Sequence, residues 1–365
     1  MIKVCHVTSA HGVEDDRIFL KECASLAANG YDVYLVERGN TYNKGGVHIT
    51  GFGDVPENRL KRMTIGARKA FRKAMQIDAD IYHLHDPELL LYALKIKRKG
   101  KTVIFDSHED VPAQISDKIW IYKPLRVIFS RFYKWYESRV VKRIDAVVTA
   151  TGHIAENFTG RANKVVIINN YPRLDDIHYH DTPFAERDAI ACYAGGIDDL
   201  RGEKTMLEAL QNVDGILLIA GDHEVMDKPE AHTRYLGRLD RQGVNLLYGS
   251  AIVGLCILKP TQNYYYSQPI KIYEYMAAGI PYICSNFPSW VKLACESGAG
   301  ICIDPSDSER LAKEINGLLL DRNRAEQMGL SGYRYVSSKC SWSAEEKKLL
   351  DLYRIVTSLK SGGSH

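Results

Sequence analysis

The chain has 365 residues, of which 45% are hydrophobic and 25% charged, with a net charge of +3. This is the composition of a globular protein of about two domains, and it excludes disordered and collagen-like chains. No apolar run approaches the roughly 18 residues of a membrane span, and a strand pattern beginning almost at Met1 leaves no room for a signal peptide. The eight cysteines lack C-x-x-C or Cys/His ligand spacing, so we expect reduced core residues in a cytoplasmic protein.

Charge is distributed unevenly between the two halves. Residues 1–170 contain 27 Lys and Arg against 19 Asp and Glu, a balance of +8, whereas residues 171–365 contain 21 against 26, a balance of −5. A basic first half predicts that this half alone meets an anionic surface or substrate.

Strand and helix patterns alternate from the start of the chain. Residues 2–7 predict a strand, residues 15–29 a helix ended by Gly30, and residues 31–36 a second strand, which is the opening of a doubly wound parallel sheet. The first loop has no G-x-G-x-x-G, which argues against a nicotinamide or flavin enzyme. Its polar residues, which would otherwise simply cap the helix, are His11, Gly12, Asp15, Asp16 and Arg17.

Two segments of the first half, 58–75 and 119–143, interleave cations with aromatic or apolar side chains, such as Arg59 beside Leu60 and Trp120 beside Lys123. Cations attract anionic lipid headgroups, and amphipathic aromatic rings favour the boundary between membrane and water. These segments are therefore predicted to form helices that bind a membrane surface. The alternative is an ordinary domain helix with core-facing rings. No nucleic-acid-binding motif accompanies this charge.

Polar residues also follow two predicted strands, at 81–84 and 103–107. Ligands of open α/β sheets bind at the carboxyl ends of strands, so both clusters are candidates for chemistry, although each residue could equally cap a loop. The clusters are His85, Asp86 and Glu88, and then His108, Glu109 and Asp110.

A polar, Pro- and His-containing stretch at 173–188 predicts a domain linker. A second α/β unit begins at residue 189, with Gly195-Gly196 after its first strand, Arg201 five residues later, and closing helices near 323–337 and 343–359.

Residues 264–288, YYYSQPIKIYEYMAAGIPYICSNFP, predict a loop, a helix and a buried strand. Ser267 is the expected N-cap, Pro269 an early helical residue, and Gly279 the helix stop. The N-terminus of a helix binds anions through its free amides and dipole, and Lys271 adds a cation there. Glu274 could accept hydrogen bonds from sugar hydroxyls, although Lys271 and Glu274 could also form a surface ion pair.

This stretch resembles the donor-site signature P-x-K-x-x-E-Y-M-x-x-G-x-P of family 4 retaining glycosyltransferases of the GT-B fold, in the bacterial subgroup that builds cell-surface polysaccharides. The matching residues are Pro269, Lys271, Glu274, Tyr275, Met276, Gly279 and Pro281. Residues 11–18, 83–90 and 106–110 resemble the same subgroup. The chain departs from the pattern at Tyr266, where the family often has a first Glu, and at Gly196, where it usually has an Arg.

The resemblance implies an α/β fold with two Rossmann-like, doubly wound domains facing a central cleft. Residues 1–172 would form the acceptor-side domain, completed by a C-terminal helix at about 343–360 that crosses back to it, and residues 189–342 the donor domain. The implied reaction moves a sugar from a nucleotide-sugar, UDP favoured over GDP, to a lipid-linked saccharide with retention and without an obligatory metal. The enzyme would lie in the cytoplasm, on the inner face of the membrane.

The resemblance also implies residue roles. The expected catalytic residues are His108, Arg201 and Lys271. The expected donor-binding residues are Gly12, Gly196, Arg201, Gly237, Arg238, Ser267, Gln268, Pro269, Ile270, Lys271 and Glu274. The expected acceptor-side residues are His11, Asp16, Arg17, His85, Asp86 and Glu88.

Two alternatives stay open. A nucleotide-sugar 2-epimerase of the same fold would need acid/base carboxylates and no acceptor, and would leave the basic aromatic segments unexplained. A non-catalytic scaffolding subunit is favoured by the two departures, Tyr266 and Gly196.

Overall fold

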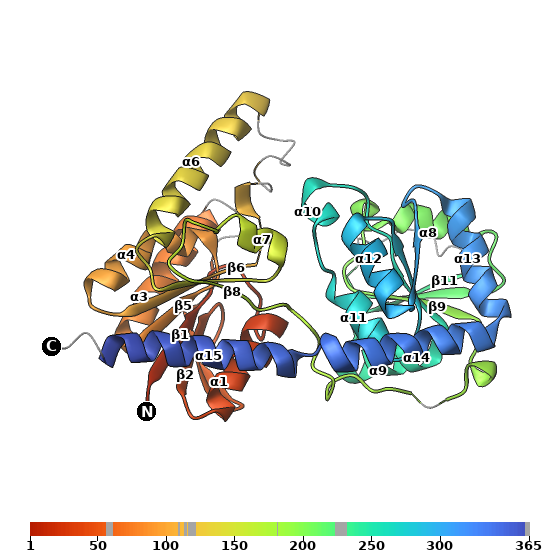
Figure 1. Ribbon diagram of the computed structural model, residues 1–365, viewed down its shortest axis with the longest axis horizontal. Coiled ribbons are helices and arrows are strands. Elements are labelled where there is room, and N and C mark those ends of the chain that lie inside the picture. The colour runs from red at the N-terminus through yellow and green to blue at the C-terminus, as the bar shows by residue number, and fades with distance from the viewer. Residues whose placement is uncertain are drawn as a thin grey trace. The chain divides into compact units, whose positions relative to one another are not determined.

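A computed structural model describes residues 1–55, 61–108, 110–112, 115, 122–180, 182–222 and 232–361. Arg59, Leu60, Glu109 and Trp120, which belong to segments predicted above, lie outside the described residues. The chain divides into two compact units (Figure 1): Met1–Asn170 with Ser343–His365, and Tyr171–Trp342.

The first unit is built on a mainly parallel sheet. Its strands, in the part of the chain that is described, are β1 (Lys3–Val7), β2 (Asp32–Glu37), β3 (Tyr42–Lys44), β4 (Val47–Gly51), β5 (Ile81–Leu84), β6 (Thr102–Ser107), β7 (Ala146–Thr149) and β8 (Val165–Ile167). They lie in the order β3-β4-β2-β1-β5-β6-β7-β8, with β3 antiparallel to β4. The β3–β4 hairpin was not predicted, although Gly45 and Gly46, both with positive φ, supply the turn that such a hairpin needs.

Helices cover this sheet. They are the π-helix η1 (Asp16–Cys23) continued by α1 (Ala24–Ala28), η2 (Arg62–Gly66) continued by α3 (Ala67–Ile77), η3 (Pro87–Leu89) continued by α4 (Leu90–Arg98), α6 (Lys123–Val141), α7 (Gly152–Glu156) and α15 (Trp342–Ser361). The carboxylate of Asp15 accepts from the Arg17 and Ile18 amides and caps η1. The prediction that the last helix belongs to the first domain is confirmed, because α15 buries Leu349, Leu352 and Tyr353 in this unit.

The second unit is built on a parallel sheet. Its described strands are β9 (Ile190–Ala194), β10 (Ile216–Ala220), β11 (Thr233–Gly237), β12 (Val253–Cys256), β13 (Tyr282–Ser285) and β14 (Gly300–Ile303), in the order β11-β10-β9-β12-β13-β14. Its helices are η4 (Phe184–Glu186), η5 (Asp199–Arg201), α8 (Glu203–Leu210), α9 (Arg241–Ser250), α10 (Gln262–Tyr265), α11 (Ile270–Ala277), α12 (Pro288–Ser297), α13 (Ser308–Leu320) and α14 (Arg322–Lys339). The strand order reverses between β9 and β12, which is where doubly wound sheets bind ligands.

The predicted linker at 173–188 packs against the second unit. Ile177 and Phe184 are buried in its core, His180 Nε2 lies 2.8 Å from the Asn245 carbonyl oxygen, and Arg187 donates to the Ala251 carbonyl at 2.9 Å. Its apolar residues therefore anchor the segment to the second unit. The mainly polar composition of the segment did not predict this packing.

The two basic segments differ in their packing. Helix α3 buries Ala67, Ala70 and Ala74 and turns its cations outward, as a domain helix does. Helix α6 projects from the body of the first unit (Figure 1) and leaves Phe132 and Trp135 62% and 57% exposed. Among the described helices, none combines the length and apolar character needed to cross a membrane.

Candidate functional site

The carboxyl edge of the second sheet is formed by closely packed glycine loops. Gly195 follows β9 with φ +126° and donates from its amide to the Ala220 carbonyl at 2.7 Å. A Cβ at Gly221 would lie 2.0 Å from the Gly195 carbonyl oxygen, so only glycine fits there. The chain after β9 and the chain after β10 thus meet with no room for a side chain between them.

Lys271 brings a cation to this loop. Its ammonium lies 3.6 Å from the centroid of the Tyr193 ring, and a Cβ on Gly195 would lie 3.3 Å from the Lys271 Nζ. Burial lowers the pKa of Lys271 to about 8, an effect that Cys256 opposes and the Arg201 charge reinforces. A partly desolvated ammonium on an aromatic face, beside a glycine loop, is well placed to bind an anion.

The start of α11 differs from the prediction by two residues. The N-cap is Pro269, not Ser267, and it makes no side-chain cap. The Ser267 hydroxyl instead donates to the Tyr264 carbonyl at 2.8 Å, in the turn after α10. Gly279 ends the helix with φ +74°, as predicted. Because Pro269 supplies no capping oxygen, the first amides of α11 face the loop without a side-chain acceptor.

Glu274 is held from two sides, so it does not form the i,i+3 pair with Lys271 that was the alternative. Its Oε1 accepts from Arg241 at 2.9 Å and its Oε2 from the Tyr248 hydroxyl at 2.8 Å. The carboxylate is 7% exposed and fixed in orientation, with lone pairs left to accept further hydrogen bonds.

The other predicted donor residues lie at or near the same edge. Arg201 ends η5 and pairs with Asp198, and its charge reaches Lys271. A Cβ on Gly196 would meet nothing within 4 Å, so the missing Arg leaves open space. Gly237 ends β11 with φ +67°, and Arg238 and Gln268 are exposed.

At the carboxyl edge of the first sheet, Asp86 organises the loop after β1. Its Oδ2 accepts from the Ser9 amide at 2.6 Å and the Thr8 hydroxyl at 2.9 Å, and its Oδ1 lies 3.1 Å from His11 Nδ1. Burial raises the pKa of Asp86, but the hydrogen bonds, His11 first, overcome this and lower it to about 2. The Glu88 carboxylate accepts from Ser9 Oγ at 3.0 Å.

His108 joins this constellation from the end of β6. Its Nε2 lies 3.0 Å from His11 Nε2, and its Nδ1 lies 3.9 Å from Asp106 Oδ1. The fold thus brings His11, Asp86, Glu88 and His108 together, from three segments that the sequence separates.

Two family models match the chain almost from end to end. Residues 17–171 match Glycosyltransferase Family 4, and residues 175–335 match Glycosyl transferases group 1. The chain belongs to the family 4 glycosyltransferases of the GT-B fold.

Solved GT-B structures resemble this glycosyltransferase along nearly its whole length. Sucrose-phosphate synthase from Thermosynechococcus elongatus superposes with a TM-score of 0.78 at 15% identity, covering 98% of this chain and all of that one. HepE of Anabaena in complex with UDP-glucose superposes with a TM-score of 0.71 at 12% identity, covering 97% and 100%. At these identities the likeness establishes the fold.

A curated relative matches over a shorter stretch. The GDP-mannose-dependent alpha-(1-6)-phosphatidylinositol monomannoside mannosyltransferase of Mycobacterium tuberculosis is 32% identical over 85 residues, which are 23% of this chain and 22% of the relative. The match thus spans about a fifth of that enzyme's length.

Arg17 and His85 of this glycosyltransferase, both expected on the acceptor side, are buried. Arg17 donates to Asp106 Oδ2 at 2.8 Å and to the Ile168 carbonyl at 2.9 Å, and His85 Nδ1 lies 3.3 Å from the same carboxylate oxygen. These side chains position the Asp106 carboxylate, whose other oxygen lies near His108. Asp16, partly exposed, pairs with Lys21 at 2.5 Å.

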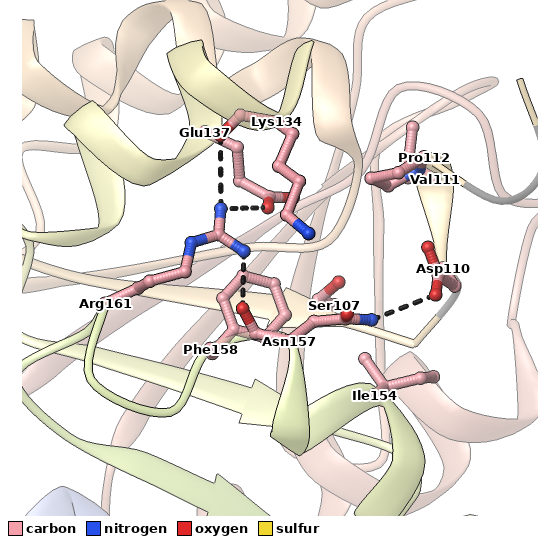
Figure 2. A pocket seen from close by; sticks show the side chains of 10 residues that line it. All are labelled: Ser107, Asp110, Val111, Pro112, Lys134, Glu137, Ile154, Asn157, Phe158 and Arg161. Carbon is pink, nitrogen blue, oxygen red and sulfur yellow. Dashed lines mark hydrogen bonds and ion pairs between the residues drawn. The ribbon is translucent and has the colours of Figure 1, made fainter. Parts of the chain in front are cut away.

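A pocket between α6 and α7 lies near the carboxyl end of β6. Figure 2 shows Arg161 turned toward Glu137, 2.8 Å away, while Asn157 donates to Asp110 at 2.9 Å. Its lining cations, Arg161 and Lys134, are balanced by two carboxylates, so a diphosphate gains little there.

One cluster was missed from the sequence. His6, Glu22, His83 and His85 gather beneath the His11–His108 constellation, all of them buried. A signal existed, because His83 and His85 have the two-residue spacing that places side chains on one face of a strand, and His6 pairs in register with His83.

Proposed function

We propose that this protein transfers a sugar from a nucleotide-sugar to a saccharide acceptor. The observation that carries the proposal is Lys271, whose ammonium lies over Tyr193 beside the Gly195 backbone, at the N-terminus of α11 and the switch point of the second sheet. A cation, helix amides and a bare loop together favour a diphosphate.

In this proposal the second unit binds the donor. Lys271 and Arg201 stabilise the charge that develops on the leaving diphosphate, which is the largest contribution that a preorganised site makes to such a reaction. Glu274, oriented by Arg241 and Tyr248, accepts hydrogen bonds from the ribose hydroxyls. The first unit contributes His108, which contacts the transferred sugar, with His11, Asp16 and Glu88 on the acceptor side.

The donor that we favour is a UDP-sugar, with a GDP-sugar as the alternative. A structural neighbour holds UDP-glucose, whereas the mannosyltransferase relative uses GDP-mannose. We further propose that the reaction proceeds with retention, and that the acceptor is a lipid-linked saccharide in bacterial surface polysaccharide synthesis. That relative's phosphatidylinositol-linked acceptor and the exposed face of α6 support a reaction at the inner surface of the membrane.

The test is a thermal-shift screen of UDP, GDP, ADP and dTDP and their common sugar conjugates. A nucleotide at a hundred times its Kd stabilises the fold by about 2.7 kcal/mol, so we expect a clear upward shift with UDP or UDP-sugars. Lys271→Ala should abolish the shift. Lys292→Ala, an exposed cation of the same unit, is the matched control and should preserve it.

A nucleotide hit is followed by a transfer assay with lipid-linked saccharides, with the product's anomeric configuration read by NMR. Retention matches the proposal and inversion contradicts it. If no nucleotide shifts the transition, or Lys271→Ala shifts like the wild type, the donor site is wrong.

A further inference from the structure

The core of the first unit contains a buried cluster of three histidines and one glutamate. His6 lies on β1, Glu22 on η1, and His83 and His85 on and just after β5. All four side chains are buried at 0–1% exposure in the core of the first unit. Burying polar groups costs free energy unless hydrogen bonds or a bound ion compensate for the lost water.

His6 Nδ1 and His85 Nε2 lie 2.9 Å apart, an ordinary hydrogen-bond distance, whereas the contacts of Glu22 with the histidines are longer. Glu22 Oε2 lies 3.8 Å from His6 Nδ1, 3.8 Å from His83 Nδ1 and 4.0 Å from His85 Nε2. These separations are too long for hydrogen bonds, and neither Glu22 oxygen makes one of normal geometry among the described residues. Its nearest cation is Arg17, whose Nε lies 3.2 Å from Oε1.

The same distances suit atoms that share a metal ion. Two ligands of a tetrahedral zinc ion, each 2.0–2.2 Å from it, lie roughly 3.3–3.5 Å apart. The three Glu22 contacts exceed this by about half an ångström, and His6 Nδ1 and His85 Nε2, 2.9 Å apart, fall short by about as much. All four ligand atoms lie within 4.8 Å of one another, so side-chain movements on the order of an ångström would produce a four-coordinate site.

We propose that His6, Glu22, His83 and His85 bind one structural Zn²⁺ ion in the core of the first unit. Three imidazoles and one carboxylate are a ligand set that zinc accepts, and four protein ligands with no open position are typical of structural sites.

Neighbouring groups complete the site. His85 turns its other nitrogen toward Asp106, and His6 Nε2 lies 3.1 Å from the Tyr353 hydroxyl, which are the outer contacts that orient metal-binding imidazoles. His83 Nδ1 is 2.9 Å from the same hydroxyl, and that contact would give way to the metal.

Charge balance supports a cation here. Glu22 and Asp106 are two buried carboxylates that share Arg17 as their cation. One guanidinium leaves the second of the two carboxylate charges unbalanced, and a bound cation would offset it.

The second group of potential ligands, His85, Asp106 and His108, is weaker because Arg17 already occupies Asp106. We therefore place the ion at the four-residue group. Since that group is fully enclosed, we expect the metal to enter during folding and to stabilise the unit that carries α15.

The experiment measures metal in the full-length protein, purified without a histidine tag, by inductively coupled plasma mass spectrometry. We expect about one zinc per chain, and His83→Ala and Glu22→Gln should each lower this content at least tenfold. Tyr353→Phe removes the hydroxyl that contacts His6 and His83 but leaves all four proposed ligands in place, so it should lower the zinc content less than His83→Ala does. His48→Ala, an exposed histidine of β4, should also retain it.

A second measurement covers variants that fail to fold. Wild-type protein is produced in zinc-depleted medium with Co²⁺, and a tetrahedral cobalt spectrum that zinc displaces supports the site. The proposal is overturned if the wild-type protein contains no stoichiometric metal and its Tm responds neither to zinc supplementation during expression nor to a chelator during refolding. Equal zinc in the wild type and in folded His83→Ala overturns it too.

Discussion

At the scale of single residues, Lys271 shows how burial and function are linked. Burial lowers its pKa from the usual 10.5 to about 8. The folded protein therefore releases this proton before the unfolded chain does, so the stability cost of the charged form is present below pH 8 and is relieved as the pH rises from 8 to 10.5. A bound diphosphate stabilises the charged ammonium and therefore raises the pKa of Lys271.

We therefore predict that nucleotide binding weakens as the pH rises above about 8, by up to tenfold per pH unit, because the ammonium must be charged to bind the diphosphate. Lys271→Arg should lose this pH dependence, since a guanidinium stays charged throughout that range. Isothermal titration calorimetry at pH 7, 8, 9 and 9.5 measures both proteins. Parallel profiles for the two would show that Lys271 is not the titrating group.

We predict that a change at Glu274 weakens nucleotide binding while the protein stays folded. Glu274→Gln keeps the side-chain volume and a carbonyl oxygen, but loses charge-assisted acceptance from the ribose, which is worth about 1.5–3 kcal/mol. We expect the nucleotide Kd to rise about tenfold or more, with a modest fall in Tm.

The matched variant for Glu274 is Arg241→Gln. It breaks the same ion pair, whose arginine is partly exposed, but leaves the carboxylate in place. We expect a similar fall in Tm with a much smaller change in Kd. If both variants weaken binding equally, the ion pair rather than the carboxylate is what binding needs.

At the scale of elements, two glycines of the loop from β9 to α8 carry different constraints. Gly202 caps α8 with φ +78°, and a Cβ there would lie 2.0 Å from the Ile257 carbonyl oxygen. Gly196 has open space around it. The first glycine is required by the backbone, whereas the second departs from the family pattern at no steric cost.

Gly202→Ala should therefore lower the free energy of unfolding by about 1–3 kcal/mol or more, through backbone strain and the clash. Gly196→Ala should change it by less than about 0.5 kcal/mol. Urea denaturation of the two variants measures this, and equal losses would contradict the assigned loop geometry. Gly196→Arg, which restores the family's cation, should also fold and should tighten nucleotide binding.

At the scale of the whole molecule, the two halves of the chain carry opposite charge, and the exposed rings of α6 lie in the basic one. Phe132 and Trp135 contact each other at a centroid distance of 5.8 Å, with Arg139 over the Trp135 ring. Exposed aromatics among cations are what an interfacial helix presents to anionic lipid.

We predict that the protein co-sediments with vesicles containing anionic lipid and is released by salt. Charge reversal at Arg131 and Lys134 of α6 should weaken binding about thirtyfold or more, at about 1 kcal/mol for each cation removed, and Trp135→Ser should weaken it without changing the salt slope. Lys313→Glu in the second unit is the control, and we expect no effect. Binding that ignores both salt and the α6 variants would contradict this account.

The fold was largely predictable from the sequence, whereas the geometry of the sites was only partly so. The strands that open each half and the stretch 264–288 were found because hydrophobic periodicity and Gly and Pro stops are local signals. The hairpin β3–β4 and the packing of residues 173–188 were missed. Short polar strands and loop anchors are decided by contacts with distant residues.

The sequence by itself determined the alternation of strands and helices, the family signature at Lys271 and Glu274, and the basic first half, since each depends on neighbours along the chain. Only the tertiary structure decided that Arg17 is buried, that Arg241 and Tyr248 hold Glu274, and that His6, Glu22, His83 and His85 meet in one core. Parallel strands bring together residues that lie some 80 positions apart, and a carboxylate acquires its partners and its pKa only where those strands enclose it.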